Sequence, residues 1–229
     1  MTIFEKFFNK SISIILPLII NFLAIFYKYN YRRFFVLETV ARIPYFSYLS
    51  VLHLYQSLGA KPSIDLLSLH FQESINETYH LRIIEDLGGG SNILDKVFAR
   101  TLGIVYYWLV VILYLIAPRS GYYLMELVES EAVLSYNKFL IKNKKQLTKQ
   151  PITEIAKEYY FGDFRMEPKE QNTKKNVTMY DVFVAIRNDE KIHTQDMNKS
   201  IENYSSYFVG DFPYSAKKSK SNHIFLSIN

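Results

Sequence analysis

Two pairs of glutamate and histidine share one spacing in this chain. Glu77 and His80 stand in "INETYH", and Glu190 and His193 stand in "RNDEKIH". In a helix, side chains three positions apart lie on the same face, so each pair can direct a carboxylate and an imidazole to one point. The chain has five histidines and no cysteine, so any metal must be bound by histidine and carboxylate, which favours iron, manganese or zinc. One such pair would be weak evidence of a metal site, and two on separate helices are stronger evidence.

A helical bundle that binds two metal ions needs two such pairs and one further glutamate from each of two other helices. About four carboxylates are needed because the charge of two cations must be balanced inside a core. Glu38 in "FFVLETVARIPYF" is the only acid near that point of its predicted helix. In "YYLMELVESEAVLSYNKF", Glu129 lies on an apolar and aromatic face, Glu126 flanks that face less centrally, and Glu131 points elsewhere. We therefore expect Glu38 and Glu129 to complete the ligand set.

The elements that must position these residues are helices, because apolar residues recur at helical spacing and alternating patterns are scarce. We predict helices over 31–59, from 63 to the glycines at 88–90, over about 91–117, 119–141 and 152–160, and over 177–204. The fold class predicted is all-α, a ferritin-like four-helix di-iron bundle with additional membrane-interfacial helices. Its domains are an apolar N-terminal membrane-associated helix in residues 1–30, the bundle in 31–204 and a basic tail in 205–229.

Composition indicates contact with a membrane. Hydrophobic residues make up 49% of the chain and aromatic residues 16%, and the net charge is +5. The apolar runs at 11–26 and 103–117 are shorter than the ~20 residues of a spanning helix, so we expect both to lie in the membrane interface. Burial of both in a soluble core is the alternative. The first run lacks a small-x-small cleavage site and is not predicted to be removed as a signal.

Other chemistries find less support. The glycines at 88–90 are not followed by the lysine and hydroxyl residue of a phosphate-binding loop, so they indicate a helix end. The basic residues are not interleaved with an aromatic platform, and no nucleic-acid partner is expected. His53 and His70 are interpreted as core or surface residues without an acidic partner at helical spacing.

Four segments carry a resemblance to a known family. They are "RFFVLETVARIPYFSYLSVLHLYQSLG", "HFQESINETYHLRIIEDLGG", "YYLMELVESEAVLSYNKF" and "MYDVFVAIRNDEKIH". From about Tyr31 to Ile201, their order and separations resemble those of the plastid terminal oxidase branch of the alternative oxidase family. The resemblance implies a membrane-interfacial, di-iron carboxylate quinol oxidase that reduces oxygen to water without pumping protons.

The resemblance also assigns roles to residues. The ligands of two iron ions would be Glu38, Glu77, His80, Glu129, Glu190 and His193. Tyr136 matches a redox-active tyrosine beside the metals, and Arg33 matches an arginine near the quinol pocket. Asn76 and Asp189 match residues next to the ligands. Tyr159 and Tyr160 match an aromatic pair ahead of the final motif, although the connection at 161–176 is shorter than in the plastid branch.

The partners implied are a quinol, plastoquinol in preference to ubiquinol, together with O2, membrane lipid and a second copy of the chain in a homodimer. The expected location is the thylakoid or plasma membrane of a cyanobacterium-like host, with a phage gene as another source. Three alternatives remain open. They are a di-iron monooxygenase acting on a quinone precursor, an iron-storage bundle, and a metal-free protein of the membrane surface.

Overall fold

Eight α-helices account for most of the residues that the structure describes. The computed structural model describes residues 2–27, 30–167 and 176–208. In chain order the helices are α1 (Ile3–Phe26), α2 (Tyr31–Ala41), α3 (Ile43–Ser57), α4 (Ile64–Asp86), α5 (Ile93–Ile116), α6 (Pro118–Leu147), α7 (Glu154–Phe161) and α8 (Met179–Asn203), followed by the 3₁₀ turn η1 (Tyr204–Tyr207). No strand occurs within these described ranges. The predicted all-α class is confirmed.

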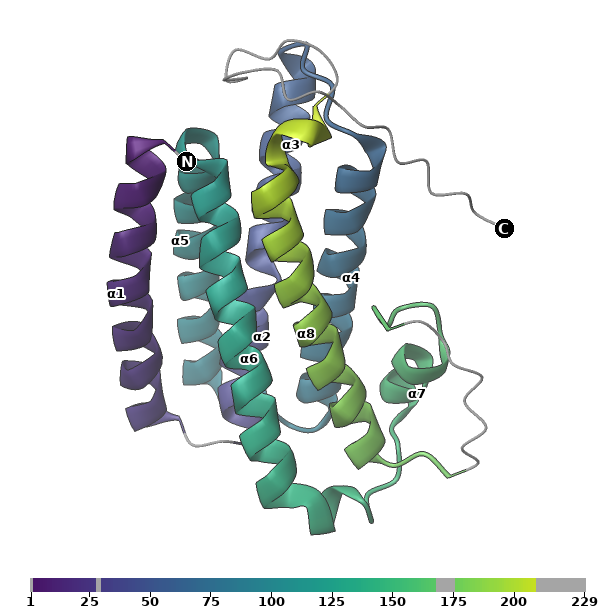
Figure 1. Ribbon diagram of the computed structural model, residues 1–229. Helices are drawn as coiled ribbons and strands as arrows, with labels where there is room; N and C mark the ends of the chain where they lie inside the picture. Colours follow the sequence, from purple (N-terminus) through teal and green to yellow (C-terminus); the bar gives the residue numbers. More distant parts are fainter. Residues whose placement is uncertain (1, 28–29, 168–175, 209–229) are drawn as a thin grey trace.

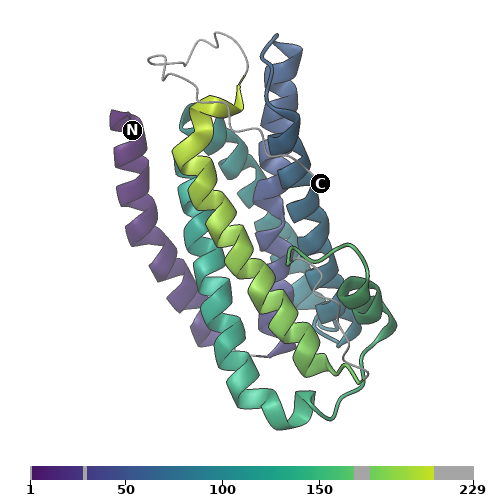
Figure 2. The same cartoon turned by 45° about the vertical axis from the view of Figure 1, so that its right-hand side comes forward.

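The long helices run side by side as a bundle (Figures 1 and 2). Helices α6 and α8 pack together along their length, α4 packs on α2 and α3, and α5 covers the other side of α2 and α3. The short helix α7 lies against α4 and α8, and α1 lies on the outside against α6. The four members of the predicted bundle are therefore α4, α6, α8 and the consecutive helices α2 and α3, which together form one member.

Local sequence sets the helix ends. The Ser63 side chain accepts a hydrogen bond from the Leu66 amide at 3.2 Å and begins α4. Thr178 and Asp181 form a capping box that begins α8. Gly88 ends α4 with φ of 86°, a left-handed conformation that glycine adopts without strain. The prediction that glycines 88–90 form a helix end is confirmed.

Two predicted boundaries differ from the structure. The segment 31–59 is not one helix, because α2 ends at Ala41 and α3 starts at Ile43. Pro44 explains the break, since it has no N–H to continue the ladder of the preceding helix. Helix α6 also continues beyond Ile141 to Leu147, and Lys144 and Lys145 in its last turn interact favourably with the helix dipole.

Aromatic side chains dominate the interior. One buried cluster is formed mainly by α2, α4, α8 and the later part of α6, and a second is formed mainly by α3, α5 and the start of α6. Tyr136 belongs to the first cluster and Tyr122 to the second. Glu129 lies midway between these two tyrosines on α6, so the two clusters flank the position of a fully buried carboxylate.

The apolar surface is concentrated on α1 and α5. Exposed side chains there include Phe7, Ile14, Leu18, Phe22, Trp108 and Ile112. Each helix has 24 residues and is long and apolar enough to cross a membrane by length and composition. The expectation that both runs are too short is wrong, because each helix extends beyond its apolar run to about 36 Å, against about 30 Å of hydrocarbon. Helix length therefore does not decide between a helix that spans the membrane and one that lies in its interface. The predicted basic tail, from residue 209 onward, lies outside the described residues.

Candidate metal centre

Six buried side chains from four helices converge inside the bundle. Glu38 comes from α2, Glu77 and His80 from α4, Glu129 from α6, and Glu190 and His193 from α8. They form two overlapping groups, and the possible ligand atoms of each group lie within 4.8 Å of one another. The first group is Glu38, Glu77, His80 and Glu190, and the second is Glu77, Glu129, Glu190 and His193. The spacing argument thus chose residues that the fold brings together.

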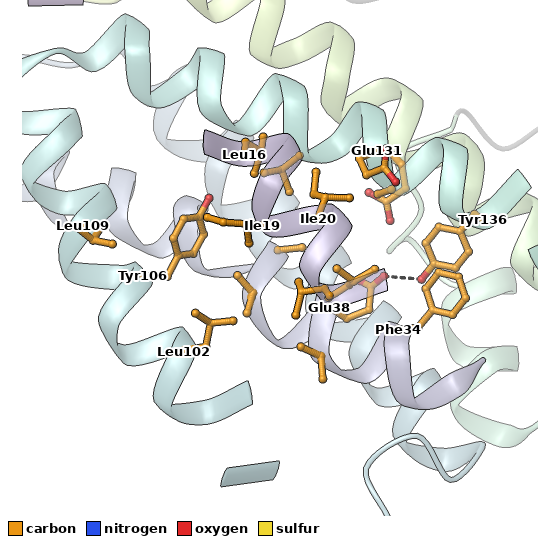
Figure 3. A pocket seen from close by; sticks show the side chains of 18 of the residues that line it. Leu16, Ile19, Ile20, Phe34, Glu38, Leu102, Tyr106, Leu109, Glu131 and Tyr136 are labelled. Carbon is orange, nitrogen blue, oxygen red and sulfur yellow. Dashed lines mark hydrogen bonds between the residues drawn. The ribbon is translucent and has the colours of Figure 1, made fainter. Parts of the chain in front are cut away.

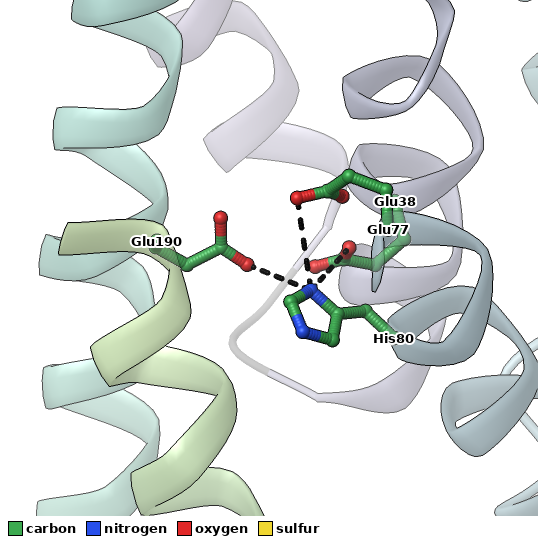
Figure 4. A group of neighbouring side chains, drawn as sticks. All are labelled: Glu38, Glu77, His80 and Glu190. Carbon is green, nitrogen blue, oxygen red and sulfur yellow. Dashed lines mark ion pairs between the residues drawn. The ribbon is translucent and has the colours of Figure 1, made fainter. Parts of the chain in front are cut away.

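The first group surrounds the Nδ1 atom of His80 (Figure 4). This nitrogen lies 3.1 Å from Glu190 Oε1, 3.7 Å from Glu77 Oε1 and 3.9 Å from Glu38 Oε2. Three carboxylates from three helices therefore face one imidazole nitrogen. Such a shell of oxygen and nitrogen donors suits a divalent or trivalent transition metal.

The second group repeats this arrangement around His193. Its Nδ1 atom lies 3.0 Å from Glu77 Oε1, 3.4 Å from Glu190 Oε2 and 3.8 Å from Glu129 Oε1. The two imidazole rings are 6.3 Å apart between centroids. Because Glu77 and Glu190 belong to both groups, each can offer one oxygen to either of two neighbouring cations.

The polar atoms at the centre need a partner. Two sets of buried atoms make no hydrogen bond of good geometry among the described residues: both carboxylate oxygens of Glu77 and Glu190, and both ring nitrogens of His80 and His193. The imidazole and carboxylate atoms approach one another only as ion pairs, at 3.0 to 3.9 Å. Leaving so many buried polar atoms unsatisfied would cost several kcal/mol, of order 1 to 3 for each group. Two bound cations would satisfy them, and the donor set fits iron.

The charges within the cluster also indicate a site for cations. Burial, reinforced by the neighbouring carboxylates, raises the pKa of Glu38 and of Glu129 well above the ordinary range. Burial alone would raise the pKa of Glu77, but the adjacent His193 and His80 outweigh it and lower this pKa. In the metal-free chain, protons therefore occupy positions that a metal would take, so metal binding must release protons.

Both imidazoles also hold protons tightly. Burial opposes their charge, but the surrounding carboxylates outweigh it and raise the pKa of His80 and of His193 well above the usual value. Without a cation, each histidine is therefore stabilised as an imidazolium by the same carboxylates that would otherwise bind metal. A metal ligand must instead be a neutral imidazole.

Asp189 supports His80 from behind. Its Oδ2 atom lies 3.5 Å from His80 Nε2 and accepts hydrogen bonds from Asn76 at 2.7 Å and from the Tyr159 hydroxyl at 2.6 Å. The backbone amide of Met166 donates to its Oδ1 atom at 3.0 Å. A carboxylate in this position fixes the orientation of a metal-binding imidazole. Asn76, Asp189 and Tyr159, all named by the resemblance, thus form one hydrogen-bonded group behind His80.

Each of the two unshared glutamates receives a hydrogen bond from a tyrosine. The Tyr136 hydroxyl donates to Glu38 Oε1, and the Tyr45 hydroxyl donates to Glu129 Oε1 at 2.7 Å. Tyr136 was predicted from the sequence, whereas Tyr45 was missed. The signal available was its spacing of seven residues after Glu38, which is also the spacing of Tyr136 after Glu129, although neither spacing indicates the glutamate to which the hydroxyl donates.

The other two predicted residues lie farther out. Arg33 is buried, with Nη2 3.5 Å from Ser135 Oγ and 3.9 Å from Glu131 Oε1. The guanidinium carbon of Arg165 lies over the ring of Tyr160, 5.0 Å from the centroid of that ring. Neither side chain belongs to either ligand group.

A cavity of about 200 Å³ reaches the centre from the side of α1 (Figure 3). Its inner wall includes Glu38, Glu190 and Tyr136. Its outer wall is made of apolar side chains from α1 and α5, such as Leu16 and Leu109. Glu131, which the sequence analysis did not choose as a ligand, lines this cavity. An apolar molecule can thus approach the metal centre from the apolar surface.

His70 is a buried residue, as one of its two predicted positions allowed, but the prediction that it has no acidic partner at helical spacing is wrong. His70 Nδ1 lies 2.8 Å from Glu73 Oε2, and both side chains are fully buried. The pair was missed because the acid follows the histidine by three residues, the reverse of the order in the two metal-binding pairs. The spacing itself was the available signal.

Comparisons with known proteins were made on the whole chain. A sequence model of the alternative oxidase family matches residues 13–203. Ubiquinol oxidase 4, chloroplastic/chromoplastic, of Arabidopsis thaliana is 43% identical over 176 residues, which are 73% of this chain and 50% of that protein. A ubiquinol oxidase of Trachipleistophora hominis is 26% identical over 198 residues, covering 84% of this chain and 57% of the relative. Mitochondrial ubiquinol oxidase 2 of Glycine max is 26% identical over 199 residues, covering 85% and 53%. The chain spans about half the length of the curated relatives it matches.

Proposed function

The chain belongs to the alternative oxidase family, and on that premise we propose that it is a membrane-bound quinol oxidase that reduces oxygen to water at a di-iron carboxylate centre without pumping protons. The observation that carries this proposal is the cavity between α1 and the bundle. Its outer wall is apolar, and its inner wall holds Glu38, Glu190 and Tyr136. A lipid-soluble reductant can therefore reach the ligands of the centre without passing through water.

Six residues would hold the iron. Glu38, Glu77, His80 and Glu190 would hold one ion, and Glu77, Glu129, Glu190 and His193 would hold the other. Bound there, the iron ions would supply the binding of oxygen and the exchange of electrons. The protein contributes the geometry, the burial and the hydrogen bonds that hold each ligand in place.

The quinol would bind with its ring at the inner end of the cavity and its tail along α1 and α5. Tyr136 lies in the wall and donates a hydrogen bond to Glu38, so its hydroxyl is placed to relay a proton and an electron from the quinol. Arg33 would fix the position of the Glu131 carboxylate, which lies in the wall of the cavity. Two quinols give up four electrons and four protons, which convert one O2 to two waters.

The substrate is proposed to be plastoquinol rather than ubiquinol, since the highest identity among the relatives above is to the chloroplastic protein. Helices α1 and α5 would lie in one leaflet of the membrane, with their exposed apolar side chains in lipid. Assembly as a homodimer remains a prediction.

The test is oxygen uptake by the iron-loaded chain in lipid vesicles supplied with plastoquinol or ubiquinol, with cyanide present. We expect uptake of one O2 for every two plastoquinols, with water as the only oxygen product. Glu77→Ala should lose both iron and oxygen uptake. Glu126→Ala removes a carboxylate that belongs to neither ligand group and should keep both. A hydroxylated quinone, or full uptake by Glu77→Ala, would overturn the proposal.

A further inference from the structure

A second buried cluster of titratable groups lies apart from the six ligands. His70 Nδ1 is 2.8 Å from Glu73 Oε2, and His70 Nε2 is 2.9 Å from the Tyr122 hydroxyl. The Tyr114 hydroxyl is 2.7 Å from that of Tyr122. All four side chains are fully buried. The proposed reaction at the metal centre uses none of them, so this tyrosine–histidine–glutamate chain needs its own explanation.

One arrangement of protons satisfies the chain. With Glu73 as the carboxylate, His70 donates its Nδ1 proton to Glu73 and presents the lone pair of Nε2 to Tyr122. Tyr122 then donates to His70, and Tyr114 donates to the Tyr122 oxygen. Burial raises the pKa of Tyr122 well above its ordinary value, so this phenol stays protonated at neutral pH. It can lose an electron readily only if its proton moves to His70 at the same time.

Aromatic rings connect Tyr122 with the metal centre. Its ring centroid is 5.0 Å from that of Tyr48, which is 6.3 Å from that of Tyr45. Tyr45 in turn is 5.6 Å from the His193 ring and donates its hydrogen bond to Glu129. Tyr122 and Glu129 are also seven residues apart on α6, about 10 Å along the helix.

The same rings continue outward to the surface. The Tyr122 centroid is 6.2 Å from that of Tyr204, which is partly exposed in η1 beneath the Arg119 guanidinium. Tyr122, His70 and Glu73 are not in the wall of the quinol cavity. Two tyrosines thus flank Glu129 on α6, with Tyr136 seven residues after it in the cavity and Tyr122 seven residues before it in the other aromatic cluster.

We propose that Tyr122 is a second redox-active tyrosine, with His70 as its proton acceptor, Glu73 as the group that stabilises the protonated His70, and the rings of Tyr48 and Tyr45 as the route for its electron. The proposal rests on the proposed function, because the oxidised iron centre is the electron acceptor. Its task is to reduce the centre when the cavity holds no quinol, and so to spare the ligands from oxidation.

The step balances. The O–H bond of Tyr122 breaks, its electron lowers the charge of the metal centre by one, and its proton moves to Nε2 of His70. The resulting imidazolium is paired with the Glu73 carboxylate. The proton stays within the cluster and the electron leaves it, so the net charge of the cluster rises by one as that of the metal centre falls by one. To reset, a water-soluble one-electron reductant such as ascorbate or a thiol donates an electron through Tyr204, and the proton returns from His70 to Tyr122.

The experiment detects the radical itself. The reduced, iron-loaded full chain without quinol is mixed with O2 and frozen rapidly, and electron paramagnetic resonance is recorded with ordinary and ring-deuterated tyrosine. All variants carry Tyr136→Phe, which removes the tyrosine of the cavity. We expect a tyrosyl signal that is lost when Tyr122→Phe or His70→Gln is added. It should persist with Tyr55→Phe, the matched control, which removes another buried hydroxyl of the same cluster, one that donates to the Leu115 carbonyl and lies outside the proposed route.

A second arm does not depend on the proposed function. The chain is loaded with zinc, which has no redox chemistry, and is oxidised by a photoexcited ruthenium complex in solution. We expect the radical to reach Tyr122 through Tyr204, and to be lost in Tyr122→Phe while zinc content and melting temperature are retained. A signal in this arm, without quinol oxidation by the iron-loaded chain, would support the redox role of Tyr122 and reject the proposed function.

Three outcomes overturn the proposal. The first is a tyrosyl signal that survives Tyr122→Phe in both arms. The second is the absence of any tyrosyl signal in both arms, and the third is a signal at Tyr122 that is unaffected by His70→Gln. If any of these occurred while quinol oxidation proceeded normally, the proposed function would stand and only the second tyrosine would be rejected.

Discussion

Among single residues, Glu77 and Glu190 matter most to the metal centre, because each takes part in both ligand groups. Removing either would affect two cations, whereas removing Glu38 or Glu129 would affect one. The Tyr136 and Tyr45 hydroxyls each hold one of these unshared glutamates. The geometry of the centre therefore depends on hydrogen bonds outside the ligand set as well as on the ligands.

Asp189 offers a test of that dependence. It lies 3.5 Å from His80 Nε2 and is itself fixed by Asn76 and Tyr159. We expect Asp189→Ala to weaken iron binding by about 10- to 100-fold, because His80 loses the partner that orients its ring. Competition with an iron chelator measures the change. Asp196→Ala removes the same charge seven residues farther along α8 and should release iron at the rate of the unmodified chain; equal release by both variants would contradict this role.

The pH dependence of stability follows from the raised pKa values. In the metal-free chain, burial with neighbouring carboxylates raises the pKa of Glu38 and Glu129, and the carboxylates outweigh burial to raise those of His80 and His193. Such groups stabilise the fold below their unfolded pKa values, about 4.3 for Glu and 6.5 for His, and lose this contribution as the pH rises through the folded values.

We therefore expect the free energy of unfolding of the metal-free chain to fall as the pH rises above about 6.5, where all four groups lose their contribution. Glu77, with its lowered pKa, acts in the opposite sense, but only at acid pH below this window. The iron-loaded chain should not show the fall, because its ligands are already deprotonated. Urea unfolding at several pH values measures both forms. A metal-free stability that rises over this range would refute the charge assignment.

At the scale of elements, helical periodicity was enough to place Glu77 with His80 and Glu190 with His193 on inward faces, since spacing along one helix decides which side chains share a face. Contacts between helices were not accessible in the same way. The bond from Tyr45 on α3 to Glu129 on α6 depends on how two helices pack, and so does the cavity beside α1. The break at Arg42 follows from Pro44, whose effect was in the sequence but was outweighed there by the continuous apolar stripe.

The outer face of helix α1 is expected to contact lipid. Leu18 and Phe22 are exposed on its outer face. We expect Leu18→Glu with Phe22→Glu to weaken binding to lipid vesicles by about 100-fold or more, since each apolar side chain contributes about 1.5 kcal/mol or more on burial. Vesicle sedimentation measures the binding. Gln72→Glu with Gln146→Glu adds the same charge on α4 and α6 and should bind as before, and equal loss in both would indicate a purely electrostatic attachment.

The whole molecule combines a charged interior with an apolar exterior on one side. The six proposed ligands are buried among α2, α4, α6 and α8, while α1 and α5 expose apolar side chains. The cavity lies between these two regions and touches both. This arrangement is the one that the proposed function requires, because a reductant from lipid must reach a centre that is kept out of water.

The most direct test of the central claim is anomalous diffraction at the iron absorption edge from crystals of the iron-loaded chain. Two peaks are predicted inside the bundle, one beside Glu38 and His80 and the other beside Glu129 and His193, with Glu77 and Glu190 between them. A single peak, no peak, or peaks away from these six side chains would contradict the account.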